Sequence, residues 1–309
     1  MNYLVTGGTG YIGSYVTRRL AFDGEAVIAF DYQPDQNLLL QVMDGNALAS
    51  VKVVKGDICD LDMLLRVCRE HGVERIIHTA AVLSDDPVAS VRVNCEGTVN
   101  VLECGRRIGA RKVVLASSVQ VFGSPENEQR DEVISNDAPH RPNTTYGACK
   151  SLNEACAAYY FLEHGLDAIA IRILEVYGWG RKNYPEASVQ TNLFWKPALG
   201  IHGVVRNGDA YHNWMYVEDA ALALVTASTV PQTRSRAFTP ACCRHTTRET
   251  ADCVRSIIGG ASIELLPGKK SYPYSFDTTP SNEELGYRPE WSMERGITRL
   301  IENIRRFRR

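Results

Sequence analysis

Short apolar segments alternate with helical segments throughout the first half of this 309-residue chain. Each apolar segment is a nearly continuous run, which is typical of strands buried on both faces. The helical segments carry apolar residues at helical spacing, as Ile12, Val16 and Leu20 do. Strands that alternate with helices form a parallel sheet covered by helices on both faces. The sequence therefore predicts an α/β fold with a doubly wound parallel sheet, whose strands include 3–5, 26–30, 51–54, 75–78, 112–115 and 167–171.

The alternation weakens after residue 174, where Tyr-Gly-Trp-Gly interrupts the pattern and polar, aromatic-rich segments follow. We expect residues 1–174 to form a Rossmann-type domain and residues 175–309 to form a smaller C-terminal lobe. A segment at about 214–230 is expected to return and pack on the first domain. Ligands of such sheets bind at the carboxyl ends of the strands, so we expect a cleft between the two parts.

Composition argues against several classes of protein. The formal net charge of −2 gives no field that would attract nucleic acid or an anionic membrane. No run reaches the ~18 apolar residues of a membrane helix, and the first residues lack the pattern of a signal peptide. The nine cysteines show no zinc-like spacing, which favours free thiols in a reducing compartment and no metal site. We therefore expect a cytoplasmic protein that binds neither nucleic acid nor membrane.

A glycine-rich string, TGGTGYIG, joins the first strand directly to the first helix. Glycine allows a tight turn and lets the backbone approach a pyrophosphate closely. The free N–H groups at the start of the following helix favour an anion. This strand–loop–helix context is the one that a dinucleotide-binding loop requires. We expect Gly7, Gly10, Tyr11, Ile12 and Gly13 to contact the cofactor.

Acidic residues follow the second and third strands. Asp31 comes directly after the second strand, where its carboxylate can accept hydrogen bonds from the ribose hydroxyls of adenosine. A 2′-phosphate would be repelled there, and no Lys or Arg in 32–40 offsets the charge, so NAD is favoured over NADP. Asp57 and Ile58 could hold the adenine. The alternatives are a turn-forming role for Asp31 and helix capping for Asp57.

A tyrosine and a lysine four residues apart, Tyr146 and Lys150, share one face of an expected helix. A lysine cation near a phenol stabilises the phenolate and lowers the pKa of the tyrosine. Such a tyrosine can exchange a proton with a substrate hydroxyl or carbonyl, and Lys150 can also hold the nicotinamide ribose. Taken alone, this spacing is also typical of a surface helix pair.

Further residues are expected beside the cofactor. Ser118 ends the fifth strand, where its hydroxyl can polarise the reacting oxygen. For Ser117, a strand-end hydroxyl bonded to backbone is the preferred interpretation. Small residues after the fourth strand would let the backbone lie against the cofactor, and an asparagine at the next helix would order the site. These residues are Thr79, Ala80, Ala81 and Asn94.

The sequence resembles the extended short-chain dehydrogenase/reductase family, in its NAD-dependent epimerase/dehydratase branch. The matching motifs are TGGTGYIG (6–13), Asp31, GDICD (56–60), HTAA (78–81), VNCEGTVNVLE (93–103), ASSVQVFG (116–123), YGACK (146–150), IRILEVYG (171–178), WMYVEDAA (214–221) and LGYRPEW (285–291). The resemblance implies Tyr146 as general acid and base, Lys150 as its partner and Ser118 as the third catalytic group. It also implies that the later lobe binds the substrate, commonly a nucleotide sugar. The resemblance further implies a homodimer formed through the helices near 93–104 and 146–164.

The chain departs from its relatives around the substrate. The dehydratases of the family carry an acidic pair after the catalytic serine or threonine, whereas this chain has Val119 and Gln120, which disfavours dehydratase activity. Nucleotide-sugar members usually have Asn where this chain has Glu175, and many have Arg near the position of His212. A carboxylate would repel a diphosphate, and histidine is a weaker, pH-dependent anion grip. The candidate substrate residues are Glu175, Arg181 and His212.

The combined prediction is NAD-dependent hydride transfer at a secondary hydroxyl or ketone of a sugar or sugar-like substrate. The mechanism would be of the Ser-Tyr-Lys type, similar to that of a nucleotide-sugar 4-epimerase. The alternative is an NAD-dependent dehydrogenase or reductase of a non-nucleotide hydroxy or keto substrate. A non-catalytic NAD sensor is a further alternative, which the presence of Ser118, Tyr146 and Lys150 disfavours.

Overall fold

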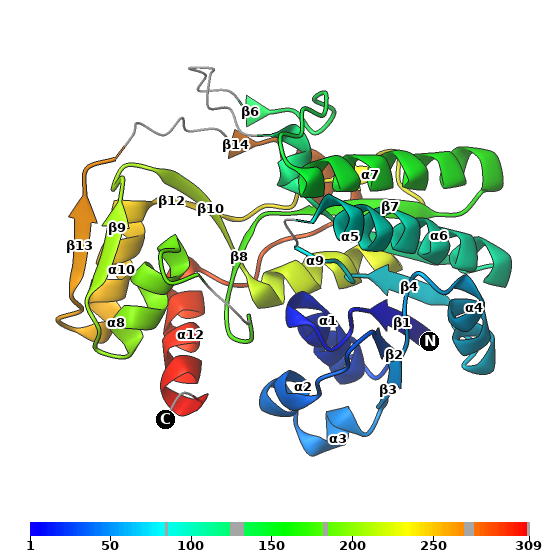
Figure 1. Cartoon of the computed structure of the whole chain (residues 1–309), viewed down its shortest axis with the longest axis horizontal. Helices are drawn as coiled ribbons and strands as arrows, with labels where there is room; N and C mark the ends of the chain where they lie inside the picture. The colour runs from blue at the N-terminus through cyan, green and yellow to red at the C-terminus, as the bar shows by residue number, and fades with distance from the viewer. Residues whose placement is uncertain (84–85, 124–132, 182–184, 269–274, 308–309) are drawn as a thin grey trace.

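The computed structural model describes residues 1–83, 86–123, 133–181, 185–268 and 275–307 (Figure 1). Within these residues, the centre of the molecule is a seven-stranded parallel sheet in the order β11-β7-β5-β4-β1-β2-β3. The strands are β1 (Asn2–Thr6), β2 (Ala26–Asp31), β3 (Val51–Lys55), β4 (Arg75–His78), β5 (Lys112–Ser118), β7 (Ala168–Ile173) and β11 (Ala237–Phe238). The predicted doubly wound α/β fold is confirmed, and all six predicted strands are present.

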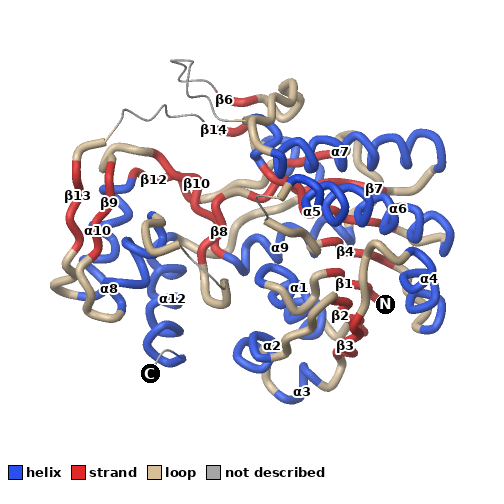
Figure 2. The backbone as a smooth tube through the Cα atoms, in the orientation of Figure 1, coloured by secondary structure: helices blue, strands red, loops and turns tan. Residues whose placement is uncertain are grey.

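Two hydrophobic cores cover the two faces of this sheet, because successive residues of a strand point to opposite faces. In β1, Tyr3 and Val5 pack into one core and Leu4 into the other. The first core is covered by α1 (Tyr11–Phe22) and α9 (Val217–Thr229), the second by α4 (Leu61–Glu70), α6 (Gly97–Ile108) and α7 (Thr145–His164). Figure 2 shows helices on both sides of the strands. Each buried apolar side chain contributes about 1.5–3 kcal/mol, so both faces must be covered.

The crossover from β4 to β5 differs from the single helix expected near 93–104. It consists of α5 (Pro87–Val91), a π-helical turn η1 (Arg92–Glu96) and α6. Asp86 caps α5 by accepting a hydrogen bond from the Val88 N–H, and the proline at 87 suits the first helical turn. A π-helical turn is uncommon and often lies near a functional site.

The chain after residue 174 contributes both to the central sheet and to a second group of elements (Figure 1). Helix α9 packs beside α1, and β11 pairs with β7 at the sheet edge. The second group contains β8 (Glu175–Tyr177), η3 (Thr191–Trp195), α8 (Lys196–Ala198), β9 (Gly203–Arg206), β10 (Tyr211–Tyr216), β12 (Cys243–Thr246), α10 (Thr247–Ile258), β13 (Ile263–Leu266), α11 (Thr279–Glu284) and α12 (Met293–Phe307). The remaining short elements are α2 (Asn37–Val42), α3 (Gly45–Leu48), η2 (Val119–Phe122), β6 (Val133–Ile134) and β14 (Ser275–Phe276).

Aromatic side chains pack the interior of the second group. The ring of Tyr177 lies 5.5 Å from that of Phe194 and 5.4 Å from that of Tyr216, between ring centroids. Trp214 is 1% exposed and packs edge-on against Phe194. These rings are therefore core residues, which explains the aromatic-rich sequence of this region.

Two general properties bear on the partners of the protein. No helix among the described residues combines the length and the apolar character needed to cross a membrane. Within the same part of the chain, no group of three or more His, Cys, Asp or Glu side chains is arranged to hold a metal ion.

Candidate active site

The carboxyl ends of the central strands open onto one cavity of about 1040 Å³. This is the position at which doubly wound sheets bind their ligands. The predicted site residues that line it are Gly7, Gly10, Tyr11, Ile12, Gly13, Asp31, Asp57, Ile58, Thr79, Ala80, Ala81, Ser118, Tyr146, Lys150 and Arg181. Three further predicted residues lie in the described part of the chain but outside this lining. They are Asn94, Glu175 and His212.

The glycine loop is packed too tightly for other residues. Gly7 has a φ of +67°, in the left-handed region that favours glycine. A Cβ atom on Gly13 would lie 1.9 Å from the Gly7 carbonyl oxygen, so a larger residue would displace the loop. At the N-terminus of α1, Gly10 offers no side-chain cap and the first turn holds no acidic residue. The first N–H groups of α1 therefore face the cavity as donors for an anion such as a pyrophosphate.

Asp31 is held at the end of β2 by the glycine loop itself. Its Oδ2 accepts hydrogen bonds from the Thr9 N–H at 3.2 Å and from the Thr9 hydroxyl at 2.9 Å. Thr9 Oγ1 in turn accepts a hydrogen bond from the Asp35 N–H at 3.2 Å. This arrangement fixes a carboxylate in the lining of the cavity while leaving lone pairs of its other oxygen for a ribose. Thr9 was missed by the sequence reasoning, although it lies within the glycine string.

Asp57 lies in the lining and does not cap the next helix. The N-cap of α4 is Asp60, which accepts a hydrogen bond from the Met63 N–H at 2.9 Å. Asp57 Oδ1 accepts a hydrogen bond from the Cys59 N–H at 2.9 Å, which shapes the turn after β3. The capping interpretation for Asp57 is therefore wrong.

Asn94 lies behind the cavity wall and does not line the cavity. The expectation that it contacts the cofactor directly is therefore corrected. Asn94 is 1% exposed, and both ends of its amide are used. Its Oδ1 accepts from the Val82 N–H at 2.9 Å and its Nδ2 donates to the Val82 carbonyl at 2.9 Å. Because Val82 lines the cavity, Asn94 fixes the wall of the site.

Ser118, Tyr146 and Lys150 come to the cavity from two elements. Ser118 ends β5, and its Oγ accepts a hydrogen bond from the Gln120 N–H at 3.2 Å. Tyr146 lies in the first turn of α7, and the Lys150 Nζ one turn later is 5.5 Å from the Tyr146 ring centroid. The Lys150 ammonium donates to the Ala116 carbonyl at 2.7 Å and is 2% exposed, which excludes a surface helix pair.

The electrostatics of this group differ from the sequence-based expectation. Burial raises the pKa of Tyr146 to about 12, although the nearby charge of Arg181 opposes this. Burial also lowers the pKa of Lys150 to about 8. The expected lowering of the Tyr146 pKa is therefore absent in the cofactor-free chain, because loss of water around the phenol outweighs the charge of Arg181.

Glu175 and His212 form a pair beside the cavity. His212 Nδ1 lies 2.8 Å from Glu175 Oε2, so this ring nitrogen carries a proton that it donates to the carboxylate. The other ring nitrogen lies 3.1 Å from Thr247 Oγ1, and the ring stacks on Trp214 at 4.6 Å. The residues on either side of Glu175 in the chain, 174 and 176, both line the cavity, whereas Glu175 and His212 do not. Since neighbouring side chains of a strand point to opposite faces, the Glu175 carboxylate is held by His212 on the side of β8 away from the lining.

Sequence reasoning missed much of the remaining lining. Several of these residues belong to loops, where no periodicity marks them. They include Gln33, Asp35, Leu38, Val82, Leu83, Asp86, Arg92, Gln120, Ile173, Leu174 and Val176. The last three could have been predicted, because they come directly after the strand predicted at 167–171 and ligands bind at the carboxyl ends of such strands.

The cavity, the glycine loop and the acidic residue after β2 define a dinucleotide-dependent enzyme with a doubly wound α/β fold. Comparison with known proteins gives the family. The profile of the NAD dependent epimerase/dehydratase family matches residues 3–238. The chain therefore belongs to this family, and it is an NAD-dependent enzyme of the extended short-chain dehydrogenase/reductase group.

Individual relatives are similar over nearly the whole chain. A dTDP-glucose 4,6-dehydratase of Streptomyces niveus is 27% identical over 98% of this chain and 92% of its own length. A UDP-glucose 4-epimerase of Thermotoga maritima, solved with UDP-glucose, has a TM-score of 0.83 at 25% identity and covers 100% of both chains. A UDP-glucose 4-epimerase of Thermus thermophilus, solved in complex with NAD, has a TM-score of 0.78 at 26% identity and covers 99% of both chains. The prediction of NAD as the cofactor is confirmed.

Proposed function

We propose that this protein transfers a hydride between NAD and a secondary hydroxyl or ketone of a sugar or sugar-like substrate, with Ser118, Tyr146 and Lys150 as the catalytic residues. The observation that carries the proposal is that these three residues line the same cavity as the glycine loop and Asp31. The glycine loop and the α1 N-terminus would hold the pyrophosphate of NAD, and Asp31 its adenosine ribose. When bound, NAD supplies a hydride acceptor and, in its oxidised form, a positive charge.

The chain supplies the proton chemistry. Ser118 Oγ would donate a hydrogen bond to the reacting oxygen. The Tyr146 hydroxyl would give its proton to a ketone, and the Tyr146 phenolate would take a proton from an alcohol. Because the pKa of Tyr146 is raised to about 12, the phenol is protonated in the cofactor-free chain. We expect it to release its proton only when positive charge enters the cavity beside Lys150. Lys150 would hold the nicotinamide ribose by its ammonium group.

Replacement of Tyr146 tests the proposal. We expect Tyr146→Phe to lower kcat by about 10²–10⁴-fold, because the proton has no other carrier, while calorimetry still detects NAD binding. A panel of free sugars, sugar acids and UDP-sugars supplies the substrate for the assay. Tyr160→Phe, a change on the same helix, is the matched control and should keep full activity. Full activity in Tyr146→Phe would rule out the proposed mechanism.

The reaction type follows from the fate of the reduced cofactor. Continuing NADH formation, followed by absorbance, identifies a dehydrogenase, whereas altered sugar stereochemistry without net NADH identifies an epimerase. Dehydratase chemistry is disfavoured because the residues after Ser118 cannot shuttle protons. Val119 is apolar, and the Gln120 side chain accepts a hydrogen bond from the Thr144 hydroxyl at 3.1 Å.

The alternative of a non-nucleotide substrate has one specific observation in its favour. The positions at which nucleotide-sugar members usually carry Asn and often Arg are held by Glu175 and His212, which bond to each other at 2.8 Å and supply no free cation for a diphosphate. Arg181 is the predicted substrate residue that lies in the lining itself. Turnover of a free sugar or hydroxy acid without turnover of UDP-sugars in the same panel would select this alternative. The reverse result would select a nucleotide sugar.

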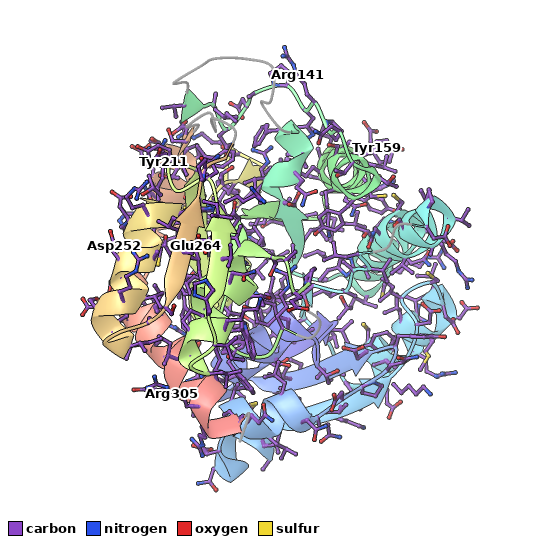
Figure 3. The ribbon with its side chains drawn as sticks, turned by 60° about the vertical axis from the view of Figure 1, so that its left-hand side comes forward. Arg141, Tyr159, Tyr211, Asp252, Glu264 and Arg305 are labelled. Carbon is purple, nitrogen blue, oxygen red and sulfur yellow. The ribbon has the colours of Figure 1, made fainter. Side chains whose placement is uncertain are left out.

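We further propose a homodimer formed through α7, as the resemblance implies, but with α5, which contacts α7, in place of the helix near 93–104. Apolar side chains are exposed there, and Tyr159 lies on the outer side of α7 in Figure 3. They are Val88, Val91, Leu152, Tyr159 and Leu162. Grouped exposed apolar residues on a monomer typically mark an interface.

Sedimentation analysis tests the homodimer. We expect Leu162→Lys to convert the dimer to a monomer, because a charge would be buried in the interface. Leu199→Lys, at an exposed apolar position in the second group of elements, is the control and should stay dimeric. A wild-type chain that sediments as a monomer would contradict the proposal.

A further inference from the structure

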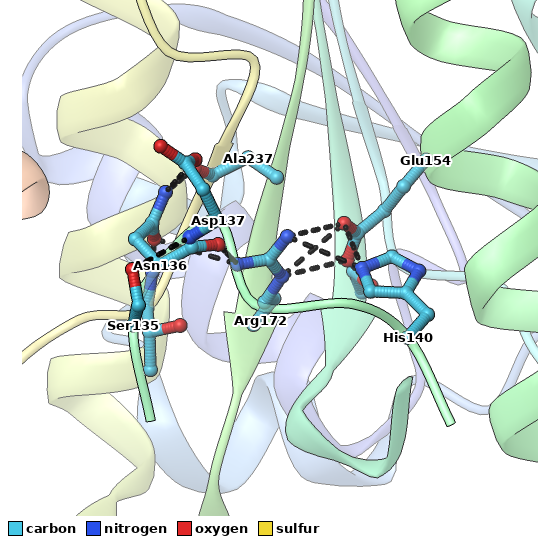
Figure 4. A network of polar contacts seen from close by, with 9 residues as sticks. Ser135, Asn136, Asp137, His140, Glu154, Arg172 and Ala237 are labelled. Carbon is cyan, nitrogen blue, oxygen red and sulfur yellow. Dashed lines mark hydrogen bonds and ion pairs between the residues drawn. The ribbon is translucent and has the colours of Figure 1, made fainter. Parts of the chain in front are cut away.

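A buried polar network joins α7 to two strands of the central sheet behind the cavity (Figure 4). Its centre is Glu154 on α7, which is 7% exposed. The Ser117 hydroxyl on β5 donates to Glu154 Oε1 at 2.5 Å, and Arg172 on β7 donates to Glu154 Oε2 at 2.8 Å. Ser117 and Arg172 are 3% and 4% exposed, and Glu154 and Arg172 also line a second cavity of about 300 Å³. The Ser117 hydroxyl thus binds a side chain and not the backbone that was expected.

The guanidinium of Arg172 is fixed from other directions as well. Its Nη1 donates to the Asn136 carbonyl at 2.6 Å, and its carbon lies 4.8 Å from the Phe122 ring centroid. The half-buried His140 reaches Glu154 Oε2 with its Nε2 at 3.4 Å. Burial opposes the ionisation of Glu154, but its bonds to His140 and Arg172 hold its pKa below the usual range. Glu154 is therefore a fixed carboxylate.

Two members of this network are adjacent to proposed catalytic groups. Ser117 precedes Ser118 in β5, and Glu154 follows Lys150 by one turn of α7. Ser117 also lies opposite Arg172 in the pairing of β5 with β7. A buried ion pair costs more desolvation than apolar packing of the same volume, so stability alone does not account for it. The network links the strand that carries the serine to the helix that carries the tyrosine and the lysine.

We propose that Ser117, Glu154 and Arg172 form a clamp that positions Ser118 against Tyr146 and Lys150 and keeps the Lys150 ammonium charged. This proposal rests on the proposed function, because it assigns the clamp to the same three catalytic groups. Glu154 and Arg172 lie outside the cavity lining, and Ser117 lines it but spends its hydroxyl on Glu154, so the three are positioning residues. A displacement of about 1 Å at such a site costs on the order of 10²-fold in rate.

The charges around Lys150 support the second part of the clamp proposal. Lys150 is influenced by Tyr146, Cys149 and Glu154 from α7, by Cys95 from η1 and by His78 from β4. Burial lowers the pKa of Lys150 to about 8, and Cys149, Cys95 and Glu154 raise it again. The Glu154 carboxylate, whose pKa is held below its usual range, places a negative charge one turn of α7 from Lys150. Loss of the Glu154 charge would therefore lower the pKa of Lys150 further.

Two variants of the full-length chain test the clamp, with NAD and whichever substrate the panel identifies. Ser117→Ala removes the Ser117–Glu154 bond between β5 and α7 but leaves intact the ion pair and the bond from Lys150 to the Ala116 carbonyl. We expect its kcat to fall about 10-fold or more, with KM and NAD affinity unchanged within about twofold. Glu154→Gln removes the charge, and we expect the alkaline limb of its kcat profile to move to lower pH. A purely structural role would not move that limb.

Matched controls separate the clamp from general effects of mutation. Ser228→Ala removes an equally buried hydroxyl, bonded to the Val225 carbonyl at 2.6 Å in α9, and should keep wild-type kcat. Glu163→Gln changes an exposed carboxylate on α7 and should keep the wild-type pH profile. If Glu154→Gln does not fold, the kcat, KM and NAD affinity of Ser117→Ala are sufficient to test the clamp.

The outcomes separate the clamp from the proposed function. Wild-type kcat in Ser117→Ala overturns the clamp, as does a folded Glu154→Gln with an unmoved alkaline limb. If Tyr146→Phe is inactive and either of these two results is found, the clamp is wrong and the proposed function stands. If Tyr146→Phe is fully active, both the proposed function and the clamp are wrong.

Discussion

His78 is a single buried side chain near the cavity whose protonation makes the stability of the fold depend on pH. It ends β4 next to the segment that lines the cavity, and it is 1% exposed. Its Nδ1 lies 2.6 Å from Thr6 Oγ1 and its Nε2 lies 3.0 Å from Thr98 Oγ1. Burial lowers the pKa of His78 to about 3, with the charge of Lys150 as the second cause. The folded chain therefore holds this imidazole neutral.

We expect His78 to make the protein sensitive to mild acid. The unfolded chain protonates His78 below about pH 6.5, whereas the folded chain does so only near pH 3. The stability contributed by the neutral imidazole is present above pH 6.5 and is lost as pH falls, by up to about 1.4 kcal/mol per pH unit. Urea denaturation of His78→Gln should therefore show a shallower loss of unfolding free energy from about pH 6.5 to 4.5.

The control for His78 is His202→Gln, at a side chain that is 52% exposed. That variant should keep the wild-type dependence of stability on pH. An equally steep loss in His78→Gln and wild type would contradict the assignment.

At the residue scale, the sequence predicted those site residues whose partners are close in the chain. The glycine loop and the Tyr146–Lys150 pair depend on local spacing, and all of them line the cavity. Asn94 was expected at the cofactor but binds the Val82 backbone, in a loop without periodicity. Glu154 escaped attention because its partners come from other elements. The raised pKa of Tyr146 depends on burial by those elements, which spacing does not report. The catalytic roles themselves stay predictions.

At the scale of elements, the turn between β1 and α1 is too tightly packed to accept a side chain at Gly13. We expect Gly13→Ala to destabilise the protein by about 1–3 kcal/mol and to weaken NAD binding by about tenfold or more, because the new Cβ would strike the Gly7 carbonyl. Thermal unfolding and calorimetry with NAD measure the two effects. Gly45→Ala, where a Cβ would meet nothing within 4 Å, should leave both unchanged. Wild-type NAD affinity in Gly13→Ala would show that the loop does not cradle the cofactor.

Element prediction succeeded where apolar runs were long and failed where elements were short. Five of the six predicted strands are central, with apolar runs buried on both faces, and the sixth, β3, forms one edge of the sheet and is only partly buried. The seventh strand, β11, has only two residues, and its pairing with β7 joins residues far apart in sequence. The helix expected near 93–104 begins earlier, at α5, and passes through the π-helical turn η1 before α6, and Asn94 in that turn bonds the Val82 backbone.

At the scale of the molecule, residues from the later part of the chain complete the sheet. Helix α9 packs beside α1 on the same face of the central sheet, and β11 pairs with β7 at the edge of that sheet. We expect a fragment of residues 1–174 to aggregate or to unfold without cooperativity, because it exposes one core face and an open strand edge. A fragment of residues 1–238 restores both elements and is the comparison. Size-exclusion chromatography and thermal unfolding distinguish the two.

A cooperative, monomeric fragment of residues 1–174 would contradict this expectation and would favour the boundary predicted at residue 174. That boundary stays a prediction, since the described elements after it contribute to both parts of the molecule.

The late arrival of β11 also has a consequence for synthesis on the ribosome. The chain emerges from its N-terminus, so β7 leaves the exit tunnel well before Ala237 and Phe238 do. At typical translation rates of about 5–20 residues per second, the outer edge of β7 stays unpaired for several seconds before β11 is synthesised. During that interval, nascent chains on one polysome can pair with each other through it, and molecular chaperones that shield strand edges would raise the yield of native enzyme.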